Sequence, residues 1–383
     1  MTARTPTLAL LLLWLLTLAC NGPDTSVEPD PPEGSINPPQ GGLTVDQTEI
    51  ELMRPPGFPP PDIPADNPLT ATKVALGKRL FFDPSLSADG TVSCGSCHFQ
   101  EHAFADPRPA SPGVGGVFGD EPHLRRNAPP LFNLAWHQTL FWDGRVEDPD
   151  RQYDLLERQV PEPIEVAHEM NSSFELVINR LSQDSSYVNH FYRAFGDSIT
   201  PLRIQQAIAS FERTLISGGS KYDQFVASGF DSTTLTPSEY RGYKLFFLEN
   251  AAGQRNAECF HCHGGYNFDD PTGALRNNGL LRFDYEDFGR YHATGRDNDY
   301  AKFKVPSLRN LAYTAPYLHD GSMDSLEEVI DRYIEIAGEA PTPGRDPLVG
   351  QILLTDQDKA DLIAFLMTLN DPDFLTNPAF QPE

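Results

Sequence analysis

The chain is poor in basic residues and in cysteine, and it has little extended hydrophobic sequence. Its 383 residues include 29 Lys and Arg against 54 Asp and Glu, a formal net charge of −25, and only 5 cysteines. The negative balance argues against nucleic-acid binding and favours a basic protein, or a positively charged face of one, as a partner. Beyond the N-terminal apolar run, no stretch is long enough to span a membrane.

The N-terminal apolar run has the pattern of a secretory signal peptide. Residues 1–19 contain Arg4, about ten consecutive apolar residues and a small residue, Ala19, before Cys20. We therefore expect export to the periplasm. Ala19-Cys20 also fits a bacterial lipoprotein that is acylated on Cys20, although Thr17 stands where such signals prefer Leu. The alternative is ordinary cleavage, which gives a soluble periplasmic protein.

A polar segment follows the signal peptide. Residues 20–66 are dense in Pro, Gly, Asp and Glu and have no apolar periodicity, which predicts an extended tether. The rest of the chain, roughly three hundred residues, is enough for two compact domains.

The other four cysteines occur in two Cys-x-x-Cys-His motifs. In such a motif the two thiols bond the vinyl groups of a porphyrin, and the adjacent histidine binds its iron. A zinc site would need four protein ligands in a closed tetrahedron, and redox dithiols are the other alternative. If the motif binds haem, His261, which stands between its two cysteines, is expected to be a solvated loop residue. The motifs predict two covalently bound c-type haems, held by Cys94, Cys97 and His98 and by Cys259, Cys262 and His263.

The two motifs belong to an internal repeat. Residues 76–98 match residues 241–263 without a gap, including Gly77 with Gly242. Each copy reads as a helix, a turn-rich loop and a haem motif. The sequence therefore predicts a mainly α fold with two cytochrome c-like haem domains that arose by internal duplication. Their predicted bounds are residues 67–218 and residues 219–375.

Helix-start residues precede both copies of the repeat. Asn67-Pro68 stands before the first, and Thr236-Pro237-Ser238-Glu239, a capping-box pattern, stands before the second. Between the motifs an apolar helical stripe predicts a core helix near the domain junction. A last helix is expected over residues 356–369. The stripe consists of Ile204, Ala207, Ile208, Phe211 and Leu215.

Five further strings resemble the bacterial di-haem cytochrome c peroxidase and MauG superfamily. They are LGKRLFFDPSLS, RRNAPPLFNLAW, FWDGR, FKVPSLRNLAYTAPYLHDGS and LEEVIDRY, in the family's order over residues 66–370. The resemblance implies an N-terminal peroxidatic haem and a C-terminal electron-transfer haem, with His98 and His263 as iron ligands. It also implies hydrogen peroxide as substrate, and relatives often form homodimers.

The resemblance also implies an acid/base group above the first haem. The family has a Gln, a Pro four residues later and a Glu six further, and Gln159, Pro163 and Glu169 keep that spacing. Glu169 would move a proton between the peroxide oxygens, Gln159 would bind peroxide or its water, and Pro163 would form an apolar wall. Glu165 and His168 are rivals for the acid/base role.

Two positions bear on electron transfer and activation. Trp142 in FWDGR corresponds to the family's tryptophan between the haems; its alternative is a core residue. Relatives often carry a removable histidine ligand on the first haem, but here Val114 stands in its place, and valine cannot bind iron. The first haem is therefore expected to react without prior reduction. His102 and His123 could substitute as ligands.

A tyrosine stands where relatives usually place the methionine ligand of the second haem. Fourteen residues after His319 comes Tyr333. Phenolate stabilises ferric and more oxidised iron, where a thioether stabilises ferrous iron, so this haem should have a low potential. This departure points towards MauG. The alternative is a core tyrosine with another ligand, of which Met323 is the nearest thioether.

One calcium ion is also implied by the resemblance. Its ligands would be Asn127 and the backbone carbonyls of Thr314 and Pro316. Oxygen ligation completed by several waters suits calcium.

We expect a periplasmic peroxidase that draws electrons from a small redox protein, a cytochrome c or a cupredoxin. One alternative is a MauG-like oxidase of side chains in a partner protein. The other is a di-haem electron carrier without a substrate, in which both irons would be six-coordinate and the Gln-Pro-Glu spacing would have no purpose.

Overall fold

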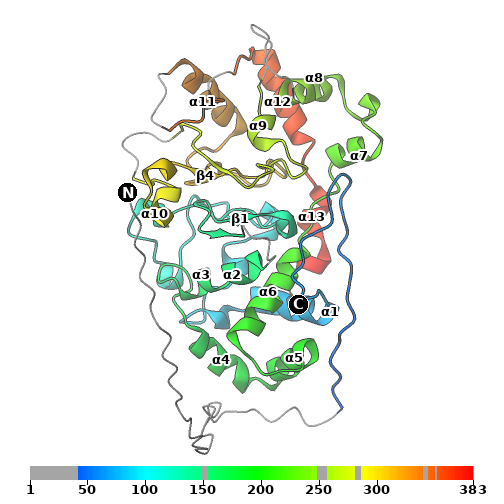
Figure 1. Ribbon diagram of the computed structural model, residues 1–383, viewed down its shortest axis with the longest axis vertical. Helices are drawn as coiled ribbons and strands as arrows, with labels where there is room; N and C mark the ends of the chain where they lie inside the picture. Colours follow the sequence, from blue (N-terminus) through cyan, green and yellow to red (C-terminus); the bar gives the residue numbers. More distant parts are fainter. Residues whose placement is uncertain are drawn as a thin grey trace, which may run out of the picture. The chain divides into compact units, whose positions relative to one another are not determined.

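The computed structural model is rich in helix (Figure 1). It describes residues 42–148, 154–247, 257–280, 286–339, 344–349 and 352–382. The signal peptide and Cys20 lie outside these ranges. The mainly α prediction is confirmed. The longer described helices are α1 (Ala71–Phe81), α4 (Phe174–Gln183), α5 (Ser185–Phe195), α6 (Pro201–Arg213), α8 (Pro237–Phe247), α11 (Leu326–Gly338) and α12 (Asp356–Met367).

Shorter elements connect these helices. Two antiparallel strand pairs are described, β1 with β2 and β3 with β4. The short elements are α2 (Leu155–Gln159), α3 (Pro161–Glu165), α7 (Lys221–Ala227), α9 (Phe260–His263), α10 (Arg290–Thr294), α13 (Pro372–Thr376), β1 (Thr139–Leu140), β2 (Val146–Glu147), β3 (Leu275–Arg276) and β4 (Phe303–Lys304).

The helix before the first haem motif crosses α6 at a glycine. A Cβ at Gly77 of α1 would lie 1.9 Å from the carbonyl oxygen of Ala207 and 3.0 Å from the Cβ of Phe211. The two backbones can approach this closely only because Gly77 has no side chain. The whole predicted stripe of α6 is buried, so the prediction of a core helix is confirmed.

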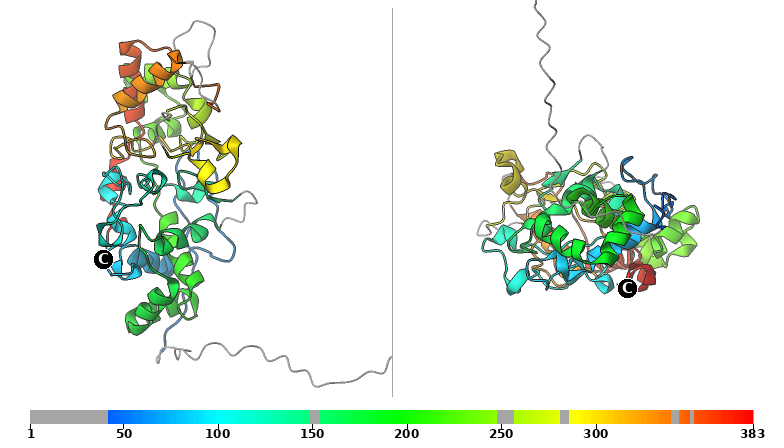
Figure 2. Two further views of the ribbon diagram at one scale, coloured as in Figure 1. Left: turned by 90° about the vertical axis from the view of Figure 1, so that its left-hand side faces the viewer. Right: turned by 90° about the horizontal axis from the view of Figure 1, so that it is seen from below.

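The helix before the second haem motif repeats this crossing. Figures 1 and 2 show α8 beside α12, and a Cβ at Gly242 of α8 would lie 1.9 Å from the carbonyl oxygen of Asp361 and 2.7 Å from the Cβ of Phe365. Because both crossings place a glycine against a carbonyl and a phenylalanine one turn later, the two haem loops start from similar helix pairs.

The helix starts follow the sequence signals in one case and differ in the other. Ahead of α8, Thr236 and Glu239 bond each other's backbone N–H groups at 2.6 and 3.3 Å, as the capping box predicts. The first helix starts later than Asn67-Pro68, because Thr70 caps it by accepting from the N–H of Lys73. Asn67 is buried instead and donates to the carboxylate of Glu157 at 2.7 Å.

The end of the predicted tether packs against the folded body. Phe58 is buried, and its ring contacts Trp136 and Tyr266 at centroid distances of 5.0 and 4.7 Å. The indole N–H of Trp136 donates to the carbonyl of Pro59 at 2.9 Å. The described part of the tether, residues 42–66, is therefore not a free linker, because its apolar ring finds a buried site.

Residues 38–383 cluster as one compact unit. Within its described part, the arginine–carboxylate pairs Arg213 with Glu157 and Arg309 with Asp223 are almost fully buried. The boundary at residues 218 and 219 stays a prediction. None of the described helices is both long enough and apolar enough to cross a membrane.

Candidate functional site

The first Cys-x-x-Cys-His motif faces a large cavity. Cys94, Cys97 and His98 line a space of about 520 Å³, within the usual size of a cofactor pocket. The Nδ1–H of His98 donates to the carbonyl oxygen of Phe104 at 2.7 Å. Ala103 and Phe104 have positive φ angles of 52° and 59°, and this tight turn brings the carbonyl back to the histidine.

The second motif faces a cavity of its own. The space is about 780 Å³ and is lined by Cys259, Cys262 and His263. The Nδ1–H of His263 donates to the carbonyl oxygens of Phe268 and Pro306, at 3.0 and 3.1 Å. His261 also lines this cavity, with its Nε2 3.9 Å from a carboxylate oxygen of Glu258.

The chemistry of both motifs fits a covalently attached haem. A carbonyl oxygen can only accept, so each Nδ1 carries the proton and each Nε2 keeps the lone pair that binds a metal. Burial lowers the pKa of His98 and lowers that of His263 to about 4, which keeps both rings neutral.

Zinc and redox dithiols fit less well. Burial raises the pKa of the Cys94 thiol strongly and that of Cys259 to about 12, whereas redox cysteines need accessible thiolates. Within the described ranges, no group of three or more His, Cys, Asp or Glu has the arrangement of a metal site.

The predicted distal residues meet in the first cavity. Gln159 at the end of α2, Pro163 in α3 and Glu169 in the following turn all line it together with His98. The N–H of Met170 donates to the carbonyl of Pro163 at 3.0 Å, which folds the turn back onto α3. Residues ten positions apart in the chain thereby reach one space.

The Glu169 carboxyl is surrounded by protein yet faces the hollow space. Its side chain retains 39% of its accessible surface, since the cavity lies beside it. Desolvation raises the pKa of Glu169, while the charge of Arg145 lowers it and that of Glu162 raises it. A carboxyl with a raised pKa exchanges protons more readily near neutral pH, as an acid/base catalyst needs.

The two rivals for the acid/base role lie differently. Glu165 is exposed and is not among the residues that line the cavity. His168 does line the cavity, with its Nε2 4.0 Å from a carboxylate oxygen of Glu169. Of the two, only His168 remains placed to exchange a proton in this space.

The loop that bears Val114 packs against the distal turn. The N–H of Val114 donates to the carbonyl of Glu169 at 2.8 Å, and its side chain packs on the core around α1 and α6. A Cβ at Gly113 would lie 2.2 Å from the carbonyl oxygen of His168, so the loop can approach this closely only at a glycine.

The two substitute histidines are separated by the structure. His102 directs Nδ1 towards the carbonyl of Tyr313 at 3.1 Å and is not among the cavity-lining residues. His123 lines the first cavity and stacks on His292, with ring centroids 4.0 Å apart. His123 is therefore the one of the two that reaches the cavity.

Trp142 lines both cavities. It lies in the turn between β1 and β2, where Gly144 has a φ of 63°. The indole N–H donates to the carbonyl of Asn127 at 2.8 Å, and the Trp142 carbonyl accepts from the N–H of Lys304 at 2.7 Å. Its position between the cavities agrees with the role that the resemblance implies.

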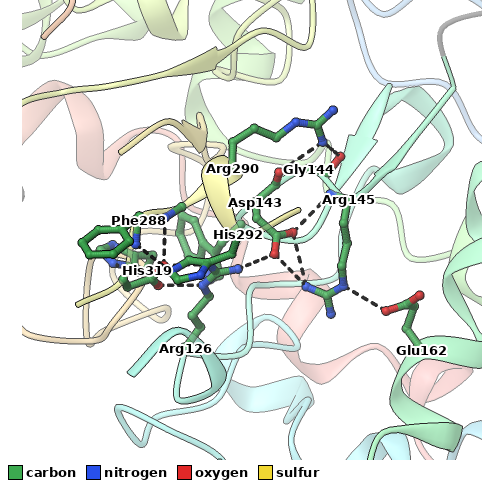
Figure 3. Close-up of polar contacts among 12 residues, drawn as sticks. Arg126, Asp143, Gly144, Arg145, Glu162, Phe288, Arg290, His292 and His319 are labelled. Carbon is green, nitrogen blue, oxygen red and sulfur yellow. Dashed lines mark hydrogen bonds and ion pairs between the residues drawn. The ribbon is translucent and has the colours of Figure 1, made fainter. Parts of the chain in front are cut away.

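A partly buried charge network surrounds this turn (Figure 3). Arg126 donates two hydrogen bonds to the Asp287 carboxylate, at 2.7 and 2.8 Å, and a third to Asp143 at 2.7 Å. Asp143 also pairs with Arg145, which extends to Glu162 at 2.9 Å. Sequence reasoning missed this network, although the Asp and Arg of FWDGR were its visible part.

Histidines from both cavities flank Asp287. The Nε2 of His292, which lines the first cavity, is 3.7 Å from one carboxylate oxygen. The Nε2 of His319, which lines the second, is 3.6 Å from the other. Phe303 packs on His319 at a centroid distance of 4.0 Å. The network therefore joins the walls of the two cavities.

Tyr333 lines the second cavity, as a ligand in that space must. The side-chain amide of Asn278 donates to its hydroxyl oxygen at 3.2 Å. Burial raises the pKa of Tyr333 to about 12, and the bond from Asn278 opposes this rise. Met323 lines the same cavity, so the alternative ligand is also present there.

The residues of the predicted calcium site also share the second cavity. Asn127, Thr314 and Pro316 all line it. The amide nitrogen of Asn127 donates to the carbonyls of Asp106 and Arg108, at 2.9 and 2.8 Å, so only its oxygen could bind a cation. Calcium stays a prediction of the resemblance.

Comparison with known proteins agrees with this site. The family model for the di-haem cytochrome c peroxidase matches residues 71–230. The chain is 36% identical over 322 residues to the methylamine utilization protein MauG of Methylorubrum extorquens, covering 82% of this chain and 83% of the relative. It is 34% identical over 319 residues to the cytochrome c551 peroxidase of Nitrosomonas europaea, covering 82% and 84%. A solved MauG-like protein associated with microbial copper homeostasis is similar at 37% identity and a TM-score of 0.73, covering 86% of this chain and 97% of that one.

Proposed function

Since the chain belongs to the di-haem cytochrome c peroxidase and MauG family, we propose that it is a periplasmic di-haem c-type peroxidase. It reduces hydrogen peroxide to water with electrons from a small redox protein. The observation that carries this proposal is that Gln159, Pro163 and Glu169 line one cavity with the Cys94–His98 motif. A pure electron carrier would have no use for an acid/base group in that place.

The chain's residues have distinct roles in this reaction. When bound, the haem supplies an iron that takes up peroxide and passes electrons to it. Glu169 removes a proton from one peroxide oxygen and returns it to the other, so that the departing oxygen leaves as water. Gln159 orients the peroxide by hydrogen bonding, and Pro163 keeps the wall beside it apolar. Two electrons and two protons per peroxide balance the formation of two waters.

A haem held at Cys259 and Cys262 would receive electrons from the donor, and Trp142, which lines both cavities, would shorten their path to the first cavity. The donor is a cytochrome c or a cupredoxin, and a basic docking face on it suits a chain of net charge −25. In this proposal Tyr333 would bind the iron of the C-terminal haem, and the side-chain amide of Asn278, which donates to the Tyr333 hydroxyl oxygen, would support the phenolate. The N-terminal signal pattern supports export, and Cys20 supports a lipid anchor.

Two further features belong to the proposal. The matching helix crossings at Gly77 and Gly242 support an origin of both haem domains by duplication. A calcium ion held by Asn127, Thr314 and Pro316 would be removed by a chelator, with loss of peroxide turnover and recovery on adding calcium.

A second candidate function is a MauG-like oxidase of side chains in a partner protein. Two features favour it: Tyr333 lines the second cavity, and the family resemblance implies that Val114 stands where relatives carry the removable ligand. A gene for a substrate protein beside this one would support it. In the test, the partner would be oxidised in proportion to the peroxide consumed, without any added electron donor.

The experiment that tests the leading proposal is steady-state peroxide consumption by the haem-loaded protein with a reduced donor. Glu169→Gln keeps the shape of the side chain but cannot exchange the proton, so we expect turnover to fall by about 10²–10⁴-fold. Glu165→Gln, an exposed carboxyl on the same stretch, is the matched control and should keep wild-type turnover. Equal activity in all three proteins would refute the assignment of this cavity.

A further inference from the structure

Another carboxyl faces the first cavity and is not used by the reaction described above. Glu212, near the end of α6, is 5% exposed and lines the cavity together with Ile208 and Cys94. Its Oε2 is buried and has no hydrogen-bond partner among the described residues. Buried carboxyl oxygens normally have partners, because burying an unpaired one is costly.

The neighbouring charged groups do not neutralise Glu212. The guanidinium of Arg213, the next residue, donates to both oxygens of Glu157 at 2.7 and 2.6 Å. Across the helix crossing, Lys73 of α1 donates to the carbonyl of Pro68 at 2.8 Å.

The remaining neighbours of Glu212 within the described ranges supply no cation either. The turn at Leu134–Trp136, which also packs on α6, carries no charged residue. Cys94 is the titratable group that faces Glu212 from the haem loop, and the attached haem would consume its thiol. Glu212 is therefore a buried carboxyl that pairs with no cation among the described residues.

The second half of the chain has an apolar residue at the matching place. Phe211 packs on Gly77 and is followed by Glu212, while Phe365 packs on Gly242 and is followed by Leu366. Leu366 lines the second cavity as Glu212 lines the first. Since leucine satisfies this position in one half, a carboxyl is not needed there for packing.

We propose that Glu212 is a proton-binding site whose occupancy follows the oxidation state of the haem attached at Cys94 and Cys97. Glu212 takes up a proton when the donor protein passes an electron to that haem, and it releases the proton when the electron leaves. Only the O–H bond forms or breaks, so each electron is balanced by one proton. The cause is Coulombic: a carboxylate is stabilised by the extra positive charge of oxidised iron and loses that stabilisation on reduction.

The titration range of Glu212 suits this role. Burial raises the pKa of Glu212 to about 8; Arg213 opposes the rise and Glu157 adds to it. The group therefore exchanges protons within the physiological range rather than staying ionised. The inference rests on the haem attachment in the proposed function but not on peroxide turnover.

The test is a spectroelectrochemical titration of the holoprotein, with the midpoint potential of the first haem followed between about pH 6 and about pH 9. We expect this potential to fall as pH rises, by up to about 59 mV per pH unit where one proton accompanies one electron. Glu212→Gln should abolish this part of the slope, and Glu212→Leu, which copies Leu366, should do the same. Exposed Glu175 on α4 provides the control Glu175→Gln, which should keep the wild-type slope.

Two comparisons make the result specific. Glu169→Gln should retain the Glu212 slope, and the potential of the second haem should not respond to Glu212→Gln. A wild-type slope in Glu212→Gln would overturn the proposal. If the wild-type protein turned over no peroxide but its first-haem potential still depended on pH through Glu212, the peroxidase proposal would fail and this one would stand.

A second measurement covers failure of the Glu212 variants to fold. Redox-difference infrared spectra of the Glu169→Gln protein should contain the band of a protonated carboxyl that appears on reduction of the first haem. Absence of that band would contradict the proposal without any change at Glu212.

Discussion

The indole N–H of Trp142 donates a 2.8 Å hydrogen bond to the backbone carbonyl of Asn127, so the ring between the two haem cavities is fixed by the segment that lies next to both. The ring centroids of Trp142 and His319 are 6.4 Å apart. The tryptophan is therefore held from the N-terminal half and packed from the C-terminal half. An aromatic ring fixed in this way can shorten the path of an electron between the cavities.

Trp142→Phe should slow transfer between the haems, because the smaller ring loses both the hydrogen bond and part of the contact. We expect peroxide turnover with a reduced donor to fall by about tenfold or more, measured by stopped-flow reoxidation of the second haem. Trp136→Phe is the matched control, since Trp136 is buried and bonded to Pro59 but lines neither haem cavity. A similar loss in both variants would mean that Trp142 acts only through packing.

The acid limb of the pH profile of kcat/KM for peroxide should reflect the pKa of Glu169. Its pKa is raised by desolvation, and the carboxylate form is the base, so kcat/KM should increase with pH through a value above the ordinary 4.5. Arg145→Gln removes the charge that lowers this pKa and should move the limb to higher pH. A limb that stays in place would show that another group, with His168 the first to examine, controls it.

Loss of the Arg126 guanidinium should destabilise the fold strongly. Arg126→Met leaves the carboxylates of Asp143 and Asp287 buried without their shared partner, which we expect to cost about 3–5 kcal/mol. The measurement is the free energy of unfolding of the holoprotein in denaturant. Lys359→Met removes a surface pair with Asp331 and should cost far less, because solvent screens such a pair. Equal costs would mean that the Arg126 network contributes little beyond an exposed pair.

The potential of the second haem should depend on Tyr333. Tyr333→Met would replace the proposed anionic ligand by a thioether, which favours ferrous iron, so we expect the midpoint potential to rise by on the order of 100 mV or more. Tyr333→Phe tests the alternative, because Met323 lines the same cavity and could take over. An unchanged potential in both variants would remove Tyr333 as a ligand.

Local patterns in the sequence were enough to predict part of the site. The haem motifs, the stripe on α6 and the Gln-Pro-Glu spacing each lie within a short stretch, where periodicity or resemblance fixes the meaning of a residue. Glu169 lines the same cavity as His98 because the distal turn folds back onto α3. These features follow from contacts between near neighbours in the chain and from one repeated helix crossing.

The remaining features depend on contacts that the sequence does not reveal. Arg126 and Asp287 are 161 positions apart, and each alone reads as a surface charge. Glu212 was passed over because one carboxyl in an amphipathic helix normally faces water. Phe58 lies in a proline-rich stretch whose composition predicts a tether, yet its ring finds a buried site beside Trp136. In each case the partner comes from a distant part of the chain.

The central claim is that the first haem cavity is open to peroxide in the fully oxidised protein. It is tested most directly by the optical and near-infrared spectrum of the all-ferric protein before and after one equivalent of hydrogen peroxide, without reductant. We predict an immediate change, which Glu169→Gln slows and Glu165→Gln does not. No change until the protein is half reduced would contradict the account, and would mean that a histidine, with His123 in the cavity wall as the first to test, caps the iron.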